Sequence, residues 1–176
     1  MSNEKYKPMM QISFPDHKMK AERIFCIGCN YAAHIKEIGF QKEKDGCVVF
    51  MKPNTALVAS GTPLIIPTDK GEVHNEVELV LCIGKEGKNI SRKTALSYIK
   101  GLSLGLDLTL RQQQQSLKEK GHPWELCKAF DNSAPIGTFT PFNTTDNWKE
   151  ISFRCLVNSE VRQQGIAGKM LYPIDY

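Results

Sequence analysis

Three carboxylates in this sequence have the types and spacing of a metal site. Glu76 and Glu78 stand two residues apart at the start of an apolar run, and Asp107 ends another. On a strand, residues two apart point to the same face, so the two glutamates would lie side by side. Like charges this close repel, so a proton or a cation must lie between them. We expect these three residues to bind one hard divalent metal, although a solvated edge strand is the simpler explanation of the glutamate pair.

A histidine and a glutamate form a second candidate group. His34 and Glu37 are three residues apart in a predicted helix, so their side chains can meet. A carboxylate that orients an imidazole suits a general base. The alternative is an exposed helical histidine with a surface charge partner. Lys52 stands at a strand end before Pro53, and a surface lysine with a packed stem remains open there.

Short strands must position most of these residues. Apolar runs and turn residues predict strands at 23–27, 48–51, 64–66, 79–83 and 101–106. Two further strands, at 151–157 and 161–164, are predicted to form a hairpin with Asn158-Ser159 at its turn. Helices are predicted at 30–38, at 91 to about 100 and at 110–120. Thr109 and Gln112 have the spacing of a capping box for the last helix.

Composition limits the class of protein. The chain has 176 residues, 41% of them hydrophobic and 24% charged, and a net charge of +4. These values favour one soluble domain without a nucleic-acid surface, a membrane span or an export signal, so we expect a cytoplasmic protein. The six cysteines fit reduced thiols in such a compartment. Cys26 and Cys29 match Cys-x-x-Cys, which leaves a redox or zinc site as a minor alternative.

Taken together, these pieces resemble the fumarylacetoacetate hydrolase family, and within it the small acylpyruvate hydrolase and oxaloacetate decarboxylase branch. The matching segments run in family order over about residues 23–172, and they are Gly28-Cys29-Asn30-Tyr31-Ala32-Ala33-His34, Phe50-Met51-Lys52-Pro53, His74-Asn75-Glu76-Val77-Glu78-Leu79, Asp107-Leu108-Thr109-Leu110-Arg111 and Trp124-Glu125-Leu126-Cys127-Lys128-Ala129-Phe130-Asp131. Any one of these segments is a weak signal, and five in order are a strong one.

The resemblance implies a fold and a site. The fold would be α+β but mostly β, a rolled mixed sheet with a few short helices, usually in a homodimer. Residues 1–22 would be a lead-in and residues 23–176 the catalytic domain. Magnesium or manganese would be held by the three carboxylates already named. The remaining site residues implied by the family are the catalytic residues Lys128, His34 and Glu37, the last two for activating water, and the substrate-binding residues Lys52, Arg111 and Gln114.

The implied reaction is hydrolysis of the carbon–carbon bond of an acylpyruvate-type β-diketoacid, a small oxo-acid. Oxaloacetate decarboxylation or tautomerisation would use the same stabilised enolate. Cys29 stands where the family usually has arginine, which removes a fixed positive charge near the pocket. Family members also continue beyond the equivalent of Tyr176, so the resemblance implies a C-terminally incomplete sheet. A catalytically impaired, partner-stabilised remnant of the family is the alternative to an active enzyme.

Overall fold

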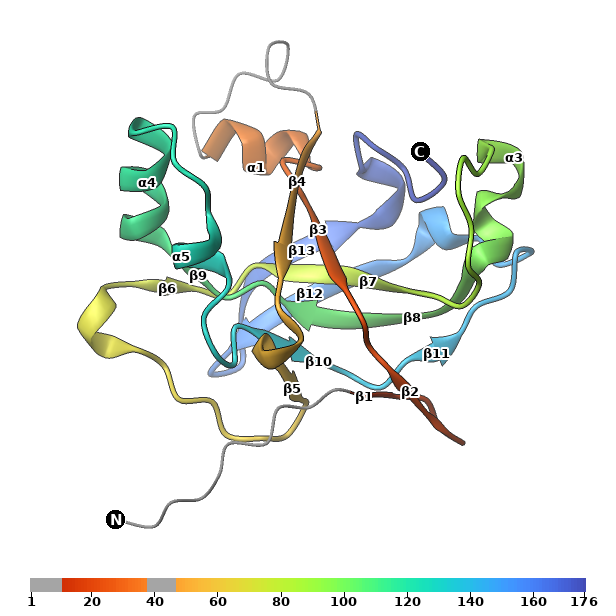
Figure 1. The fold of residues 1–176 in the computed structure, drawn as a ribbon, viewed down its shortest axis with the longest axis horizontal. Coiled ribbons are helices and arrows are strands. Elements are labelled where there is room, and N and C mark those ends of the chain that lie inside the picture. Colours follow the sequence, from red (N-terminus) through yellow and green to blue (C-terminus); the bar gives the residue numbers. More distant parts are fainter. Residues whose placement is uncertain (1–10, 38–46) are drawn as a thin grey trace.

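A mixed sheet forms the centre of the computed structural model, which describes residues 11–37 and 47–176 (Figure 1). Its strand order is β11-β8-β10-β5, with β7 paired to β8. The strands are β5 (Leu57–Ala59), β7 (Val77–Ile83), β8 (Ile99–Leu106), β10 (Ala134–Ile136) and β11 (Thr140–Pro141). The β10–β5 pair is parallel, whereas β7, β10 and β11 each run antiparallel to β8.

Smaller antiparallel pairs surround this sheet in the described part of the chain. They are β1 (Gln11–Ser13) with β2 (Lys18–Lys20), β3 (Ile24–Gly28) with β4 (Val48–Lys52), β6 (Val73–His74) with β9 (Thr109–Leu110), and β12 (Ser152–Val157) with β13 (Glu160–Ile166). The mostly β, mixed-sheet architecture expected from the sequence is confirmed.

The helices are short. They are α1 (Ala32–Glu37), α3 (Arg92–Ala95), α4 (Arg111–Glu119) and α5 (Glu125–Lys128). In Figure 1, α1 and α4 lie above one end of the β7–β8 pair and α3 lies at the other end. Helix α5 contacts both β4 and β9, so it joins the β3–β4 pair to the end of β8 where the candidate site lies.

The segment before residue 23 contributes to the core, which the sequence did not predict. Phe14 is 5% exposed and packs against Phe139, with ring centroids 5.4 Å apart. The Phe14 ring lies so close to Gly101 in β8 that a Cβ atom there would come within 2.5 Å of it. The strands β1 and β2 are therefore part of the fold rather than a polar lead-in.

Two element predictions are wrong. Residues 64–66 form no strand. The helix predicted from 91 to about 100 is helical only at α3, followed by a 3-10 turn over Leu96–Tyr98. It ends early because Ile99 already pairs with Ile83 in the β7–β8 ladder, and this long-range pairing outweighs local helix preference.

The predicted capping box is also wrong. The hydroxyl of Thr109 donates to the carbonyl oxygen of Asp107 at 2.9 Å, and Thr109 pairs with His74 in the β6–β9 ladder. Helix α4 has Leu110 at its N-cap position, without a side-chain capping bond.

The C-terminal hairpin is confirmed. At its turn, Asn158 and Ser159 have φ values of 51° and 68°, the left-handed backbone of a type I′ turn. None of the helices formed by the described residues has the length and apolar character needed to cross a bilayer.

Candidate functional site

The ends of β7 and β8 bring two of the three predicted carboxylates together, Glu76 and Asp107. Glu76 lies just before β7 and Asp107 just after β8, and the amide of Asp107 donates to the carbonyl oxygen of Glu76 at 2.8 Å. This bond continues the antiparallel ladder by one step beyond the Val77–Leu106 pair. Both side chains are buried, at 7% exposure each. A solvated edge strand therefore does not describe Glu76.

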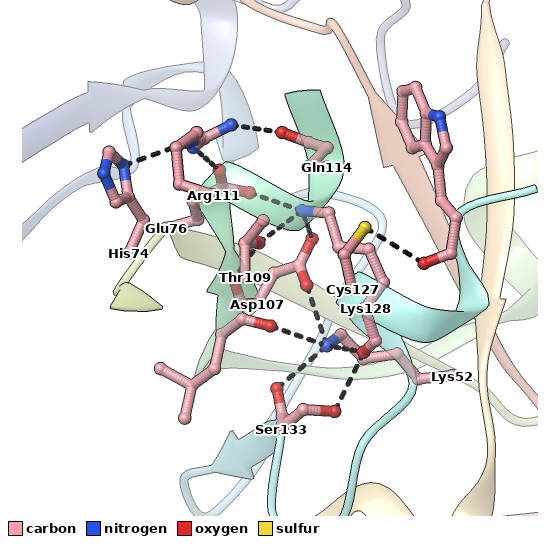
Figure 2. A network of polar contacts seen from close by, with 12 residues as sticks. Lys52, His74, Glu76, Asp107, Thr109, Arg111, Gln114, Cys127, Lys128 and Ser133 are labelled. Atoms are coloured by element: carbon pink, nitrogen blue, oxygen red, sulfur yellow. Dashed lines mark hydrogen bonds and ion pairs between the residues drawn. The ribbon is translucent and has the colours of Figure 1, made fainter. Parts of the chain in front are cut away.

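Lys128 bridges these two carboxylates from the last residue of α5 (Figure 2). Its Nζ donates to Glu76 Oε2, Asp107 Oδ2 and Thr109 Oγ1, each at 2.6 Å. The residue is 2% exposed. Burial lowers the pKa of Lys128, but the neighbouring charges of Asp107 and Glu76 raise it by more, so the net shift is upward. The Lys128 ammonium therefore stays charged between the two acids.

Helix α4 adds a second cation. The Arg111 guanidinium donates to Glu76 Oε1 and to Gln114 Oε1, and its Nε lies 3.2 Å from His74 Nδ1. Arg111 and Gln114 are one turn apart on the same face of α4. Gln114 is 4% exposed. The predicted residues Arg111 and Gln114 thus lie beside the predicted carboxylates, as Figure 2 shows.

Glu78 is the carboxylate with the most perturbed environment. Burial raises the pKa of Glu78 to about 8, and the negative charges of Asp107 and Glu76 add to the effect.

The donor chemistry of these acids fits a hard divalent cation, which prefers carboxylate oxygens. Asp107 Oδ1 is buried and lies 2.9 Å from the Lys52 ammonium. The described side chains hold no group of three or more His, Cys, Asp and Glu residues already arranged around one point. In this structure the cation between Glu76 and Asp107 is the Lys128 ammonium.

Lys52 lies deeper than a substrate-binding residue was expected to lie. Its side chain is 1% exposed, and its Nζ is 2.9 Å from Asp107 Oδ1. The ammonium also donates to main-chain carbonyl oxygens at the base of the site. The surface-lysine alternative is wrong.

The proposed water-activating pair is only partly described. His34 and Glu37 both belong to α1, but their side chains lie outside the described part of the chain. Cys29 precedes this helix, is 6% exposed and has a φ of 59°, a left-handed backbone that is uncommon outside glycine. Neither Cys26 nor Cys29 forms a disulfide in the described part of the chain.

Two buried hydroxyls of the site were not predicted. Thr109 accepts from Lys128 and donates to the Asp107 carbonyl, so it connects the cation to the backbone of the acid. Ser133 donates to the Lys128 carbonyl oxygen at 2.9 Å. Thr109 lies in one of the segments that carry the family resemblance, whereas no local pattern marks Ser133.

Known proteins resemble this chain in sequence. The family model described as fumarylacetoacetate (FAA) hydrolase C-terminal matches residues 23–176. The chain is 42% identical over 153 residues to the oxaloacetate tautomerase YcgM of Escherichia coli (strain K12), an alignment that covers 86% of this chain and 69% of that protein. It is 34% identical to a mitochondrial oxaloacetate decarboxylase of Dictyostelium discoideum, over 88% of this chain and 71% of that one.

A solved structure shows the same fold. The crystal structure of fumarylpyruvate hydrolase from Pseudomonas aeruginosa, in complex with Mn2+ and pyruvate, superposes with a TM-score of 0.88 at 34% identity. The match covers 96% of this chain and 75% of that one. The model match, the sequence identity and the shared fold together place this chain in the fumarylacetoacetate hydrolase family.

Proposed function

We propose that the chain is a divalent-metal-dependent enzyme acting on short 2-oxo acids. The relatives are named for oxaloacetate tautomerisation, oxaloacetate decarboxylation and fumarylpyruvate hydrolysis. All three reactions develop negative charge on a 2-oxo oxygen. The observation that carries the proposal is the buried cluster in which Lys128 contacts both Glu76 and Asp107. It offers oxygen ligands and a positive charge in one low-dielectric place.

The proposed reaction is hydrolysis of the carbon–carbon bond of acylpyruvate-type β-diketoacids. Oxaloacetate tautomerisation or decarboxylation is the related activity of the same site. Glu76, Glu78 and Asp107 would hold Mg2+ or Mn2+. When bound, such an ion supplies Lewis-acid polarisation of the 2-oxo and carboxylate oxygens of the substrate.

The residues of the chain itself bind the substrate and move its protons. Lys128 places a positive charge where the oxygen of the cleaved or enolised acid becomes negative. Arg111 and Gln114 orient the carboxylate end from α4, where a planar guanidinium suits a carboxylate. Glu37 orients His34, which takes a proton from water or from the substrate carbon.

The test is turnover measured with a metal titration. Loss of the enol absorbance of acetylpyruvate is followed with and without Mg2+, and the decay of oxaloacetate is followed in parallel. Glu78→Ala should abolish metal-dependent turnover because it removes a proposed metal ligand. Glu86→Ala serves as the matched control, because Glu86 is exposed in the loop after β7. It should retain full activity.

The two acids distinguish the candidate reactions. Loss of acetylpyruvate alone assigns the hydrolase, and loss of oxaloacetate with release of CO2 assigns the decarboxylase. Faster enol–keto equilibration of oxaloacetate without release of CO2 assigns the tautomerase. Absence of all three in protein that is folded by circular dichroism would refute the enzyme and support an inactive member of the family.

A homodimer is part of the proposal. The outer face of β3–β4 exposes two cross-strand apolar pairs, Phe25 with Met51 and Ile27 with Val49. A contiguous apolar face of this kind is typical of protein–protein contacts. Light scattering after size exclusion should give twice the mass of the chain, and Phe25→Glu should reduce it to one chain. A monomeric wild type would refute this assembly.

A cytoplasmic location is the remaining part of the proposal. The six cysteines are free in this structure, as expected for a reducing compartment. Fractionation of cells expressing a tagged chain would test it.

A further inference from the structure

Lys52 ends β4 with its side chain inside the molecule. Its side chain is 1% exposed and stands beside the Phe130 ring, 5.8 Å from the centroid. Burial lowers the pKa of Lys52, and the charge of Asp107 opposes that shift. A buried ammonium is costly unless every N–H has an acceptor. The acceptors around Lys52 therefore indicate its role.

Three main-chain carbonyl oxygens receive its hydrogen bonds. Nζ donates to the oxygen of Leu108 at 3.2 Å, to that of Ser133 at 3.0 Å and to that of Lys128. These oxygens come from the residue after Asp107, from the end of α5 and from the turn before β10. One side chain thus ties together the segments that carry the site, as Figure 2 shows.

Asp107 is held by a different kind of contact. Three carbonyl oxygens already use the three N–H groups of the ammonium. Asp107 Oδ1 lies 2.9 Å from Nζ as an ion pair, yet it receives no hydrogen bond from the described residues. Lys52 therefore fixes the direction of the carboxylate through its charge at 2.9 Å.

We propose that Lys52 is a positioning residue, whose ammonium orients Asp107 and the backbone of Lys128 for metal binding and which does not touch the substrate. This inference rests on the proposed function, because it takes Asp107 as a metal ligand. Residues that orient metal ligands typically change metal affinity by about 10- to 100-fold when replaced. A substrate-binding lysine would instead change the affinity for the acid.

The first experiment measures binding rather than turnover. Isothermal titration gives the affinity for Mn2+ and then, at saturating Mn2+, the affinity for pyruvate. Lys52→Met should weaken Mn2+ binding by at least about tenfold and change pyruvate binding by less than about threefold. Wild-type Mn2+ affinity in folded Lys52→Met, or a loss confined to pyruvate, would overturn the proposal.

Two control variants separate positioning from general stability. Ser133→Ala removes another buried hydrogen bond to the Lys128 carbonyl but leaves the Lys52–Asp107 pair intact. It should lower the free energy of unfolding by about 1 kcal/mol and keep the Mn2+ affinity of wild type. Lys88→Met, in an exposed loop, should change neither quantity. Equal losses of Mn2+ affinity in Ser133→Ala and Lys52→Met would contradict a specific role for Lys52.

The second experiment uses the wild-type chain, so it does not depend on a variant that folds. Trace acetylation followed by peptide mass spectrometry should label exposed Lys120 and leave Lys52 unlabelled, with or without Mn2+ and pyruvate. Labelling of Lys52 that pyruvate prevents would identify a substrate contact and overturn the proposal. The failures are distinguishable, because a wild type without Mn2+ binding refutes the proposed function while the labelling still reports on Lys52.

Discussion

At the scale of single residues, one ammonium group forms ion pairs with two carboxylates. Lys128 is 2.6 Å from an oxygen of Glu76 and 2.6 Å from an oxygen of Asp107. Removing one partner from such a buried group leaves uncompensated charge, which is costlier than a lost surface pair. Lys128 therefore has a structural effect that can be measured apart from catalysis.

Lys128→Met should destabilise the metal-free protein by about 3 kcal/mol, because Glu76 and Asp107 lose their shared cation. Added Mg2+ should restore part of this stability by supplying another positive charge to the same oxygens. Urea unfolding in EDTA and in Mg2+ measures both effects. Lys120→Met, on the exposed end of α4, is the control and should be neutral. A loss in Lys128→Met as small as that of the control would contradict the ion-pair account.

The sequence predicted the acids and Lys128 of this candidate site by residue type and family pattern. It did not identify the hydroxyls of Thr109 and Ser133, because their contacts join segments that are distant along the chain. Thr109 has the spacing of a helix cap, but its hydroxyl donates to the Asp107 carbonyl. Local sequence preference could not show that the Asp107 carbonyl oxygen competes with the helix end for the Thr109 hydroxyl.

At the scale of elements, the long strands with apolar runs were predicted, whereas the three-residue strands, including the apolar β5, were not. β7, β8 and the β12–β13 hairpin follow from hydrophobicity and turn residues. β1 and β2 are three residues each, with charged side chains on β2, so their pairing leaves little trace in the sequence. Residues 64–66 have the composition of a strand but no partner in the ladders of the described residues.

The hairpin turn allows a test of backbone strain. Ser159 holds a φ of 68°, a conformation that costs a residue with a Cβ roughly 1 kcal/mol. Ser159→Gly should therefore raise the free energy of unfolding by about 0.5–1 kcal/mol. Ser152→Gly, in β12, should lower it by a similar amount, because glycine weakens a strand. Urea denaturation of both variants checks the opposite signs, and the same sign in both would contradict the turn assignment.

Gly101 allows a test of close packing in β8. An added Cβ would lie 2.5 Å from the Phe14 ring and 2.8 Å from the carbonyl oxygen of Thr140. Gly101→Ala should therefore cost about 1–3 kcal/mol of stability. Gly28→Ala, whose nearest neighbour would be 3.5 Å away, should cost far less. Thermal unfolding compares the two, and equal midpoints would show that β1 and β8 do not pack as described.

At the scale of the whole molecule, the site is formed by residues from separate parts of the fold. Lys52 ends β4, Glu76 precedes β7, Asp107 follows β8 and Lys128 ends α5. The unfolded chain does not bring these residues together. A metal that binds the assembled site must therefore stabilise the native state as its concentration rises.

Mg2+ or Mn2+ should raise the unfolding midpoint progressively as the metal concentration rises. At a metal concentration 100 times the dissociation constant, the free energy of unfolding should increase by about 2.7 kcal/mol. Differential scanning fluorimetry over a metal titration measures the shift. Glu78→Ala should remove the dependence and Glu86→Ala should retain it. An unfolding midpoint of the wild type that does not change with metal concentration would refute the proposed ligand set.

The base of α1 is joined to a distant part of the chain. The Asn30 side chain exchanges two hydrogen bonds with the backbone of Tyr172, at 3.0 and 2.7 Å, and these residues are 142 positions apart. During translation at roughly 5–20 residues per second, Asn30 leaves the ribosome about ten seconds before Tyr172 is made. The helix that carries His34 and Glu37 thus acquires this anchor only after Tyr172 has left the ribosome, so a nascent chain stalled before Tyr172 lacks it.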